Sequence, residues 1–231
     1  MKPKPHPDRL NNAPDKSETA LVLIDVINDL EFEGAERLLE HALPMADALA
    51  KFKARAKAAG IPAIYANDNF GRWRSDFRAL VKYCLGKRIR GRTVVRQLKP
   101  AADDYFVLKP KHSAFFKTNL DLLLKYLGVR TVILTGMASD ICVLFSANDA
   151  YMRDLNVIVP SDCVAAQSAE QNRIVLDLMA RVLKARIAPS QAIEFSRGTQ
   201  HRMRPDHGAR SSRTEHATAS VRPGLATASR K

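Results

Sequence analysis

The sequence of 231 residues contains little cysteine: Cys84, Cys142 and Cys163 are its only thiols. So few cysteines, in odd number, exclude a disulfide framework and are typical of a reducing compartment. Long hydrophobic runs are also lacking, since charged residues interrupt every apolar stretch well before the roughly 20 residues that a membrane span requires. The N-terminal residues lack the apolar core of a secretory signal. We therefore expect a cytoplasmic protein without a membrane partner.

Acidic residues are scarce relative to basic ones, 24 against 37, and the net charge is +13. Part of the excess lies in residues 196–231 and part in a basic cluster at residues 82–99. Such charge favours nucleic acid or an anionic surface as partner. However, aromatic residues do not alternate with the basic ones, as they do in proteins that stack bases. We interpret both regions as solvated and expect no nucleic-acid partner.

Both ends of the chain have the composition of disordered segments. Residues 1–17 are polar and rich in proline, and residues 196–231 are a basic tail rich in Ser, Thr, Ala and Gly. Between them, residues 18–195 are expected to form one domain, with enough hydrophobic residues (46% of the whole chain) for a sizeable core. Apolar runs predict strands at residues 20–25, 61–66, 105–109, 130–135, 156–159 and 186–188, and longer periodic segments predict helices at 36–59, 76–85, 116–127, 140–153 and 169–184.

This alternation predicts an α/β fold with three layers, α/β/α, of the Rossmann-like kind. Right-handed crossovers would then form a six-stranded parallel sheet in the order 3-2-1-4-5-6. Pro44 lies near the middle of the helix predicted at residues 36–59, so that helix is expected to be kinked or split. Residues 86–103 are expected to form a basic loop.

Three reactive residue types follow predicted strands. Asp25 ends one apolar run, Lys109 ends another, and Cys142 lies just beyond a third. Each has an ordinary explanation by itself: a turn former, a solvated strand end and a small buried hydrophobe. In open α/β sheets, however, ligands bind outside the carboxyl ends of the strands. The coincidence of the three predicts a reactive site there.

Cys142 lies in the first turn of a predicted helix, after the segment 135–141. Backbone N–H groups and the positive end of the helix dipole favour a thiolate and a neighbouring oxyanion at such a place. Ser139 is expected to cap this helix, and Asp140 complements its dipole. Cys163 also follows a strand, but no helix begins immediately before it.

The chain resembles the isochorismatase-like cysteine hydrolase superfamily, which includes nicotinamidases and N-carbamoylsarcosine amidohydrolases. The resemblance covers roughly residues 18–188, and its motifs occur in the order of the family. They are Leu23–Asp29, Leu108–Phe115, Thr118–Leu120, Thr135–Val143 and Ala147–Ala150, with Asp162 beyond them.

The resemblance implies a catalytic triad of Asp25, Lys109 and Cys142. Asp25 would take the thiol proton and later return it to the leaving amine, while Lys109 would hold Asp25 and help to lower the thiol pKa. The family's non-proline cis peptide maps to Met137–Ala138. The N–H groups of Ala138 and Cys142 would then form the oxyanion hole.

Two neighbours of Lys109 are rivals for these roles. Lys111 precedes the same Ser-Ala-Phe segment, but Lys109 ends the apolar run directly and matches the family lysine. His112 is a candidate acid or base, since histidine as a residue type exchanges protons near neutral pH. Its position in the family pattern is variable and often aromatic, so it is left out of the triad.

Several positions depart from the family pattern. Ile27 stands where many relatives have Gln, and Leu30 where Phe is common; these two, with Trp73 and Phe115, are the expected substrate-binding residues. Nicotinamidases carry an Asp-x-His metal motif after the second strand. Here Asp68 is followed by residues 69–70, Asn and Phe, so we expect no metal and no cofactor, and nicotinamidase activity is disfavoured.

The sequence thus predicts a hydrolase acting on a non-peptide C–N bond of a small amide or ureido substrate, through a Cys142 thioester. Two alternatives remain open at this point. One is isochorismatase-type hydrolysis of a vinyl ether, whose enzymes do not need the thiol. The other is a non-enzymatic basic binding protein on the same fold. The resemblance also implies a homo-oligomer.

Overall fold

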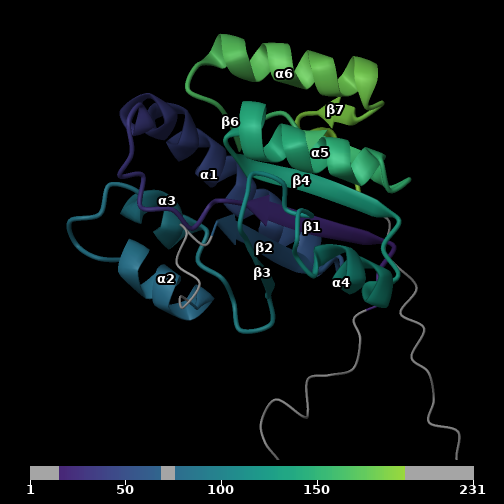
Figure 1. The fold of residues 1–231 in the computed structure, drawn as a ribbon, viewed down its shortest axis with the longest axis horizontal. Coiled ribbons are helices and arrows are strands. Elements are labelled where there is room, and N and C mark those ends of the chain that lie inside the picture. The colour runs from purple at the N-terminus through teal and green to yellow at the C-terminus, as the bar shows by residue number, and fades with distance from the viewer. Residues whose placement is uncertain (1–15, 69–75, 196–231) are drawn as a thin grey trace, which may run out of the picture. The chain divides into compact units, whose positions relative to one another are not determined.

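A parallel sheet lies at the centre of the structure, a computed structural model that describes residues 16–68 and 76–195 (Figure 1). Its strands run in the order β3-β2-β1-β4-β5-β7, and the short β6 pairs with β4. The strands are β1 (Thr19–Ile24), β2 (Ala63–Asp68), β3 (Tyr105–Lys109), β4 (Thr131–Met137), β5 (Asn156–Pro160), β6 (Val164–Ala165) and β7 (Arg186–Ala188).

Helices cover both faces of the sheet. One face packs against α1, α2 and α3, and the other against α4, α5 and α6. The helices are α1 (Ala35–Ala58), α2 (Phe77–Cys84), α3 (Arg92–Gln97), α4 (Leu120–Leu127), α5 (Leu144–Tyr151) and α6 (Ala169–Val182), with a π-helical turn η2 (Ser139–Val143) and a 3-10 turn η3 (Ser190–Ala192). The predicted three-layer α/β/α fold is confirmed.

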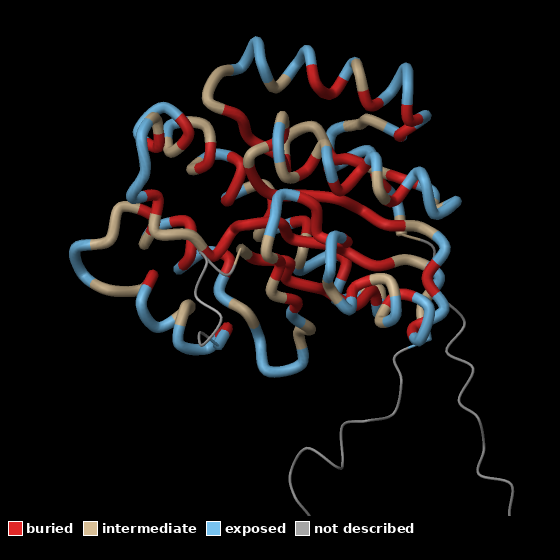
Figure 2. The backbone as a smooth tube through the Cα atoms, in the orientation of Figure 1, coloured by how far each residue is buried: buried red, intermediate tan, exposed pale blue. Residues whose placement is uncertain are grey.

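Strand β1 shows why the sequence forms this core. Its residues alternate between the two faces: Leu21 and Leu23 contact the layer of α1, whereas Val22 and Ile24 contact the layer of α4 to α6. All four side chains are fully buried. A strand in the middle of a parallel sheet, covered on both faces, is therefore apolar throughout. Figure 2 shows the buried strands running through the centre, with exposed positions on the helices around them.

The strand order is the predicted one, with the strand predicted at residues 186–188 as β7. The sheet differs by one strand, because the two residues of β6 pair with the end of β4 at Gly136 and Met137. Strand β2 begins two residues later than predicted and ends at Asp68, so that Asp68 pairs with Lys109.

Three helical predictions need correction. Helix α1 is unbroken, although Pro44 lies within it, because Ala42, Met45 and Ala46 around the proline are buried against the core. The loop predicted at residues 86–103 contains α3, whose Val94 and Val95 are buried. The buried apolar face explains why a segment this short is helical.

The helix predicted at residues 116–127 begins only at Leu120. Side chains hold the preceding residues in turns instead: Thr118 Oγ1 donates to the carbonyl of Ala114 at 2.6 Å, and it accepts from the N–H of Leu120 at 3.2 Å. Such local side-chain bonds compete with the helical backbone pattern.

Among the described residues, no helix is long and apolar enough to cross a membrane. The expected disordered tail, residues 196–231, and residues 1–15 of the N-terminal segment lie outside the described residues, as does Trp73.

Candidate active site

The three residues of the expected triad meet at the carboxyl edge of the sheet. Asp25 follows β1, Lys109 is the last residue of β3, and Cys142 lies in η2, just after β4. Strand β1 lies between β2 and β4, with Ile24 paired to both Ala66 and Gly136. The sheet register thus brings together residues that are far apart in the sequence.

Asp25 and Lys109 form a buried ion pair. Lys109 Nζ lies 2.7 Å from Asp25 Oδ2, and the two residues are 0% and 5% exposed. The other carboxylate oxygen, Asp25 Oδ1, accepts from the backbone N–H of Asp68 at 2.8 Å. Lys109 Nζ also donates to the carbonyl of Lys111 at 3.2 Å. Removing one partner of such a pair would leave an uncompensated buried charge.

The Cys142 thiol completes the cluster. Its sulfur lies 3.7 Å from Lys109 Nζ, and the thiol also hydrogen-bonds the carboxylate of Asp25. Cys142 is partly exposed, whereas its two partners are buried. A substrate carbonyl can therefore reach the sulfur from solvent while the charged groups act from below.

Burial and charge shift the pKa values of all three groups. Burial raises the pKa of the Asp25 carboxyl, although Lys109 opposes the shift. Burial would lower the pKa of Lys109, but Asp25 and Cys142 together raise it above its ordinary value, so the amine stays protonated. A carboxylate with a raised pKa is a stronger base.

The pKa of the Cys142 thiol is raised to about 12, first by burial and then by the negative charge of Asp25. Lys109 lowers this pKa, but less than the other two causes raise it. The lysine thus helps to lower the thiol pKa, as expected, but burial and Asp25 outweigh it. The catalytic roles of the three residues stay predictions.

The turn before Cys142 is shaped by a close approach of two strands. The Met137–Ala138 peptide bond is cis. Gly136, with φ +104°, lies so close to β1 that an added Cβ would be 2.0 Å from the carbonyl oxygen of Ile24. Only glycine fits there, so Gly136 sets Asp25 and the Cys142 turn side by side.

The first turn is π-helical rather than α-helical. The Ala138 carbonyl accepts from the N–H groups of Ile141 and Val143, both at 3.2 Å. Ser139 does not cap the turn as expected: its side chain is fully buried, and its Oγ has no hydrogen-bond partner among the described residues. The N–H group of Ile141, from which a capping hydroxyl would accept, is instead donated to the Ala138 carbonyl.

Sequence reasoning did not identify the residues that hold the loop after Lys109 against the cysteine helix. Ser146 Oγ accepts from the N–H of Ala114 at 2.9 Å and donates to the carbonyl of Cys142 at 2.7 Å. Ser113 Oγ donates to the carboxylate of Asp149. The one signal in the sequence was the motif Ala147–Ala150, which contains Asp149 and belongs to the family resemblance. That Ser113 is the partner of Asp149 follows only from the structure.

Three of the expected substrate-binding residues are buried. Ile27 and Leu30 are fully buried in the core layer of α1. Phe115 is 4% exposed and packs in the other layer, 4.8 Å below the guanidinium of Arg153. Direct contact of these three with a substrate stays a prediction. Trp73 is outside the described residues.

No group of three or more His, Cys, Asp or Glu side chains in residues 16–68 and 76–195 could hold an ion. Asp68 lies in the site, with Oδ2 4.0 Å from Lys109 Nζ.

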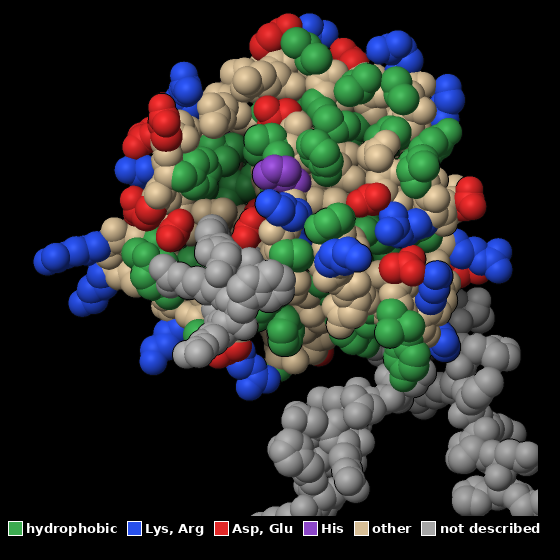
Figure 3. All heavy atoms as spheres, in the orientation of Figure 1, with side chains coloured by type: hydrophobic (Ala, Val, Ile, Leu, Met, Phe, Trp, Pro, Cys, Tyr) green, Lys and Arg blue, Asp and Glu red, His purple; other side chains and the backbone are tan. Residues whose placement is uncertain are grey.

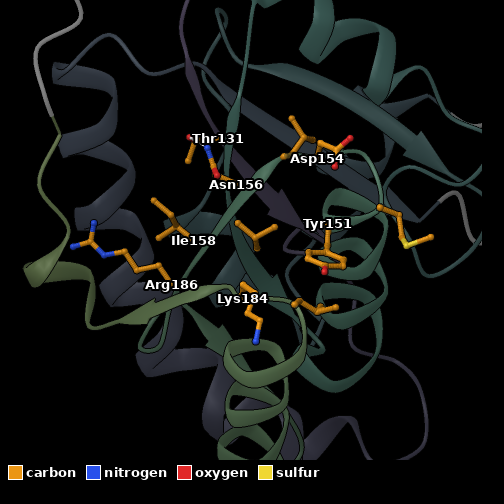
Figure 4. Close-up of a pocket in the computed structure, with 11 residues that line it drawn as sticks. Thr131, Tyr151, Asp154, Asn156, Ile158, Lys184 and Arg186 are labelled. Carbon is orange, nitrogen blue, oxygen red and sulfur yellow. Dashed lines mark hydrogen bonds between the residues drawn. The ribbon is translucent and has the colours of Figure 1, made fainter.

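A surface depression of about 670 Å³ lies elsewhere on the domain (Figure 4). Thr131 and Asn156, at the amino ends of β4 and β5, line it with Tyr151, Lys184 and Arg186. It therefore lies at the opposite end of the strands from Cys142, and it is not the cavity of the triad.

The fold and the site together define an α/β protein with a cysteine, a carboxylate and an amine at the carboxyl edge of a parallel sheet. The isochorismatase domain model matches residues 19–189, and the chain belongs to this family. The prediction of an isochorismatase-like hydrolase is confirmed.

Two curated relatives and one solved structure illustrate the family. The "uncharacterized isochorismatase family protein YaaI" of Bacillus subtilis is 39% identical over 77% of this chain and 97% of its own length. The ureidoacrylate amidohydrolase RutB of Acinetobacter baylyi is 25% identical over 74% of this chain and 79% of its own. The N-carbamoylsarcosine amidase of Thermoplasma acidophilum superposes with a TM-score of 0.59, at 28% identity, covering 77% of this chain and 99% of that one.

Proposed function

We propose that the protein is a cysteine amidohydrolase that cleaves a small amide or ureido C–N bond through a thioester on Cys142. The observation that carries the proposal is the contact of one partly exposed thiol with a buried carboxylate and a buried amine. Relatives named as a ureidoacrylate amidohydrolase and an N-carbamoylsarcosine amidase support this class of substrate.

In the first half of the reaction, Cys142 Sγ attacks the carbonyl carbon while its proton passes to Asp25. The tetrahedral intermediate collapses, the C–N bond breaks, and Asp25 returns the proton to the leaving nitrogen. A thioester remains on Cys142. In the second half, water attacks the thioester, Asp25 takes a proton from the water, and that proton returns to the sulfur as the acid leaves.

Lys109 acts electrostatically in both halves. Its charge holds the Asp25 carboxylate at 2.7 Å and faces the sulfur at 3.7 Å. Negative charge on sulfur or on the carboxylate therefore always has this amine as a neighbour. The backbone N–H groups of Ala138 and Cys142 are the proposed donors to the oxyanion.

The vinyl-ether alternative is distinguished by the thiol. One curated relative is named isochorismatase, and it is 27% identical over 75% of this chain. Hydrolysis of a vinyl ether proceeds by protonation and does not need a nucleophilic sulfur. An intact Cys142 beside its base favours the amide or ureido reaction.

The test is turnover of a panel of small amides and ureido acids by wild type, Cys142→Ala, Asp25→Asn and Lys109→Met. Cys142→Ala is expected to abolish ammonia or amine release, and the other two substitutions to lower it by orders of magnitude. Mass spectrometry of quenched wild type should find an acyl group on Cys142. Cys163→Ala, which removes a buried thiol that lies after another strand, is the matched control and should keep activity. Activity that survives Cys142→Ala would contradict the proposal.

A further inference from the structure

A buried asparagine lies next to the last residue of β2. Asn67 is fully buried, although asparagine is disfavoured within strands. Its Nδ2 donates to the backbone carbonyl of Ile27 at 2.8 Å, and its Oδ1 has no hydrogen-bond partner among the described residues. A flipped amide would place two oxygens face to face, so the donor is the group that the fold uses. Asn67 has no role in the mechanism proposed above.

Three consecutive residues of β2 hold the turn that begins at Asp25. The carbonyl of Ala66 accepts from the N–H of Asp25 at 3.0 Å, and the N–H of Asp68 donates to Asp25 Oδ1 at 2.8 Å. Between these two, Asn67 donates to the carbonyl of Ile27, two residues after Asp25. The outer two bonds use the backbone of β2, whereas the middle bond needs a side chain that carries an N–H donor.

The backbone of this turn needs such support. Asp25 has φ 52° and Leu30 has φ 56°, both in the left-handed region that side chains disfavour. Residues persist in this region when their surroundings hold them there. Arg90 holds the far half of the turn, since its Nη1 donates to the carbonyl of Leu30 at 2.8 Å. Asn67 holds the half that lies next to Asp25.

The place of this turn decides where the carboxylate lies. Asp25 Oδ2 is 2.7 Å from Lys109 Nζ, and the carboxylate also hydrogen-bonds the thiol of Cys142. We propose that Asn67 is a positioning residue, whose amide fixes the turn after Asp25 and so keeps the carboxylate within reach of the sulfur. This inference rests on the proposed function, in which Asp25 is the base. Because Asn67 acts through Asp25, its loss should matter only while that carboxylate is present.

Asn67→Leu tests the inference, because it removes the donor and keeps a side chain of similar size. Tyr65→Phe is the matched control on the same strand. Tyr65 is also fully buried, and its hydroxyl donates to the carbonyl of Leu98 at 2.8 Å. Each substitution therefore removes one buried donor to a backbone carbonyl, but only the first affects the turn of Asp25. Asn67→Ala, which cannot clash, replaces Asn67→Leu if the leucine variant does not fold.

Hydrogen exchange tests the fixed turn without knowledge of the substrate. In Asn67→Leu, the backbone amides of Asp25 and Asp68 should exchange about fivefold to tenfold faster relative to the amides of β4, as expected for the loss of one hydrogen bond. Tyr65→Phe should leave these two ratios unchanged. Exchange rates resolved by NMR measure the effect.

Turnover then tests the role of Asn67 in the reaction. In Asn67→Leu, kcat/KM should fall at least about tenfold, since a displacement of about 1 Å can cost 10²-fold. In the Asp25→Asn background, the same substitution should change the residual turnover by less than about twofold. A merely structural role would lower turnover equally in both backgrounds.

Unchanged exchange of the Asp25 and Asp68 amides in Asn67→Leu would overturn the inference, as would an equal loss of turnover in the two backgrounds. Failure of the proposed function gives a different result, because turnover would then survive in Cys142→Ala. The exchange rates do not depend on the thiol, so the two failures are distinguishable.

Discussion

Asp25 affects the thiol in two opposite ways. In the proposed mechanism it is the base that receives the thiol proton, but as a fixed negative charge it raises the pKa of the Cys142 thiol and disfavours the thiolate. The proposal therefore starts from a neutral thiol, whose sulfur becomes nucleophilic as its proton passes to Asp25.

Asp25→Asn separates these two effects. Turnover should fall by about 10²- to 10⁴-fold, the usual contribution of a general base. Alkylation of Cys142 by iodoacetamide should stay as fast or become faster, because the substitution removes the charge that raises the thiol pKa. Steady-state kinetics and alkylation rates measure the two effects.

Asp177→Asn, which changes an exposed carboxylate paired with Arg173, is the control and should alter neither rate. A parallel loss of turnover and alkylation in Asp25→Asn would show that the carboxylate activates the resting thiol, contrary to this account.

The raised pKa of Asp25 also predicts the pH dependence of the reaction. The base must be ionised, so kcat/KM falls as the pH falls through the pKa of Asp25. Because burial raises that pKa, the acid limb should lie above 3.8, the ordinary value of the carboxyl. A pH profile of kcat/KM on a neutral substrate measures it. A single limb near 9.0, the ordinary thiol value, would instead show that free thiolate is the reacting species.

At the level of the elements, the contact of β1 with the end of β4 positions the nucleophile. Gly136 has a backbone conformation that disfavours side chains, and it faces the Ile24 carbonyl, where a Cβ would lie at 2.0 Å. Any side chain there must push β4 from β1, and with it the turn of Cys142 from Asp25.

Gly136→Ala should therefore destabilise the fold by about 3 kcal/mol or more, through the combined costs of overpacking and of positive φ. Gly60→Ala is the matched control. Gly60 has φ +77°, and an added Cβ would meet no atom within 4 Å, so only the conformational cost of about 1 kcal/mol remains. Urea unfolding of both variants measures the difference; equal losses would mean that the strands adjust without cost.

The elements that local pattern defines could be predicted from the sequence. Strand β3 and strand β7 have the predicted bounds, since each is a short apolar run next to turn residues. The segment of α3 could not be predicted, because its two buried valines stand among basic residues and resemble a loop. The meeting of Asp25, Lys109 and Cys142 could be predicted, because each follows a predicted strand and the carboxyl ends of parallel strands lie at one edge of the sheet. The pKa of Cys142 could not, because it depends on a balance of burial and two opposite charges that only the folded site sets.

For the whole molecule, part of the basic excess is structural. In the cluster at residues 82–99, Arg90 pairs with Glu36 at 2.9 Å and donates to the carbonyl of Leu30, and Arg92 donates to the carbonyl of Leu85. Figure 3 shows Lys and Arg side chains spread over one face, with acidic and hydrophobic side chains between them. Mixed charge of this kind favours solubility over binding of a polyanion.

Removal of residues 196–231 should leave turnover, Cys142 alkylation and the urea midpoint unchanged, because the described core is complete at Phe195, which packs 5.2 Å from Phe52. Kinetics and unfolding of the truncated chain measure this. A truncation to residue 190, which removes Ile193 and Phe195, is the comparison that should destabilise. Loss of activity on removing the tail alone would assign the tail a role in the site.

Homo-oligomerisation stays a prediction from the family resemblance. The exposed apolar side chains Ile141, Phe145 and Met152 on the cysteine helix and the turns beside it are consistent with a buried contact between copies. Light scattering coupled to size exclusion measures the mass. A single 25.7 kDa species at micromolar concentration would contradict the prediction.

The three groups of the site follow β1, end β3 and lie in the turn after β4. Strand β2 lies between β3 and β1, so it must be paired with both before the groups can meet. No fragment or partly folded chain can therefore assemble the cluster. During refolding, the coupling of Cys142 alkylation to Lys109 would return only when the long-range pairings of the sheet are complete, which is the slow part of folding. The alkylation rate of Cys142 would therefore report the last step of folding, and no attached dye would be needed.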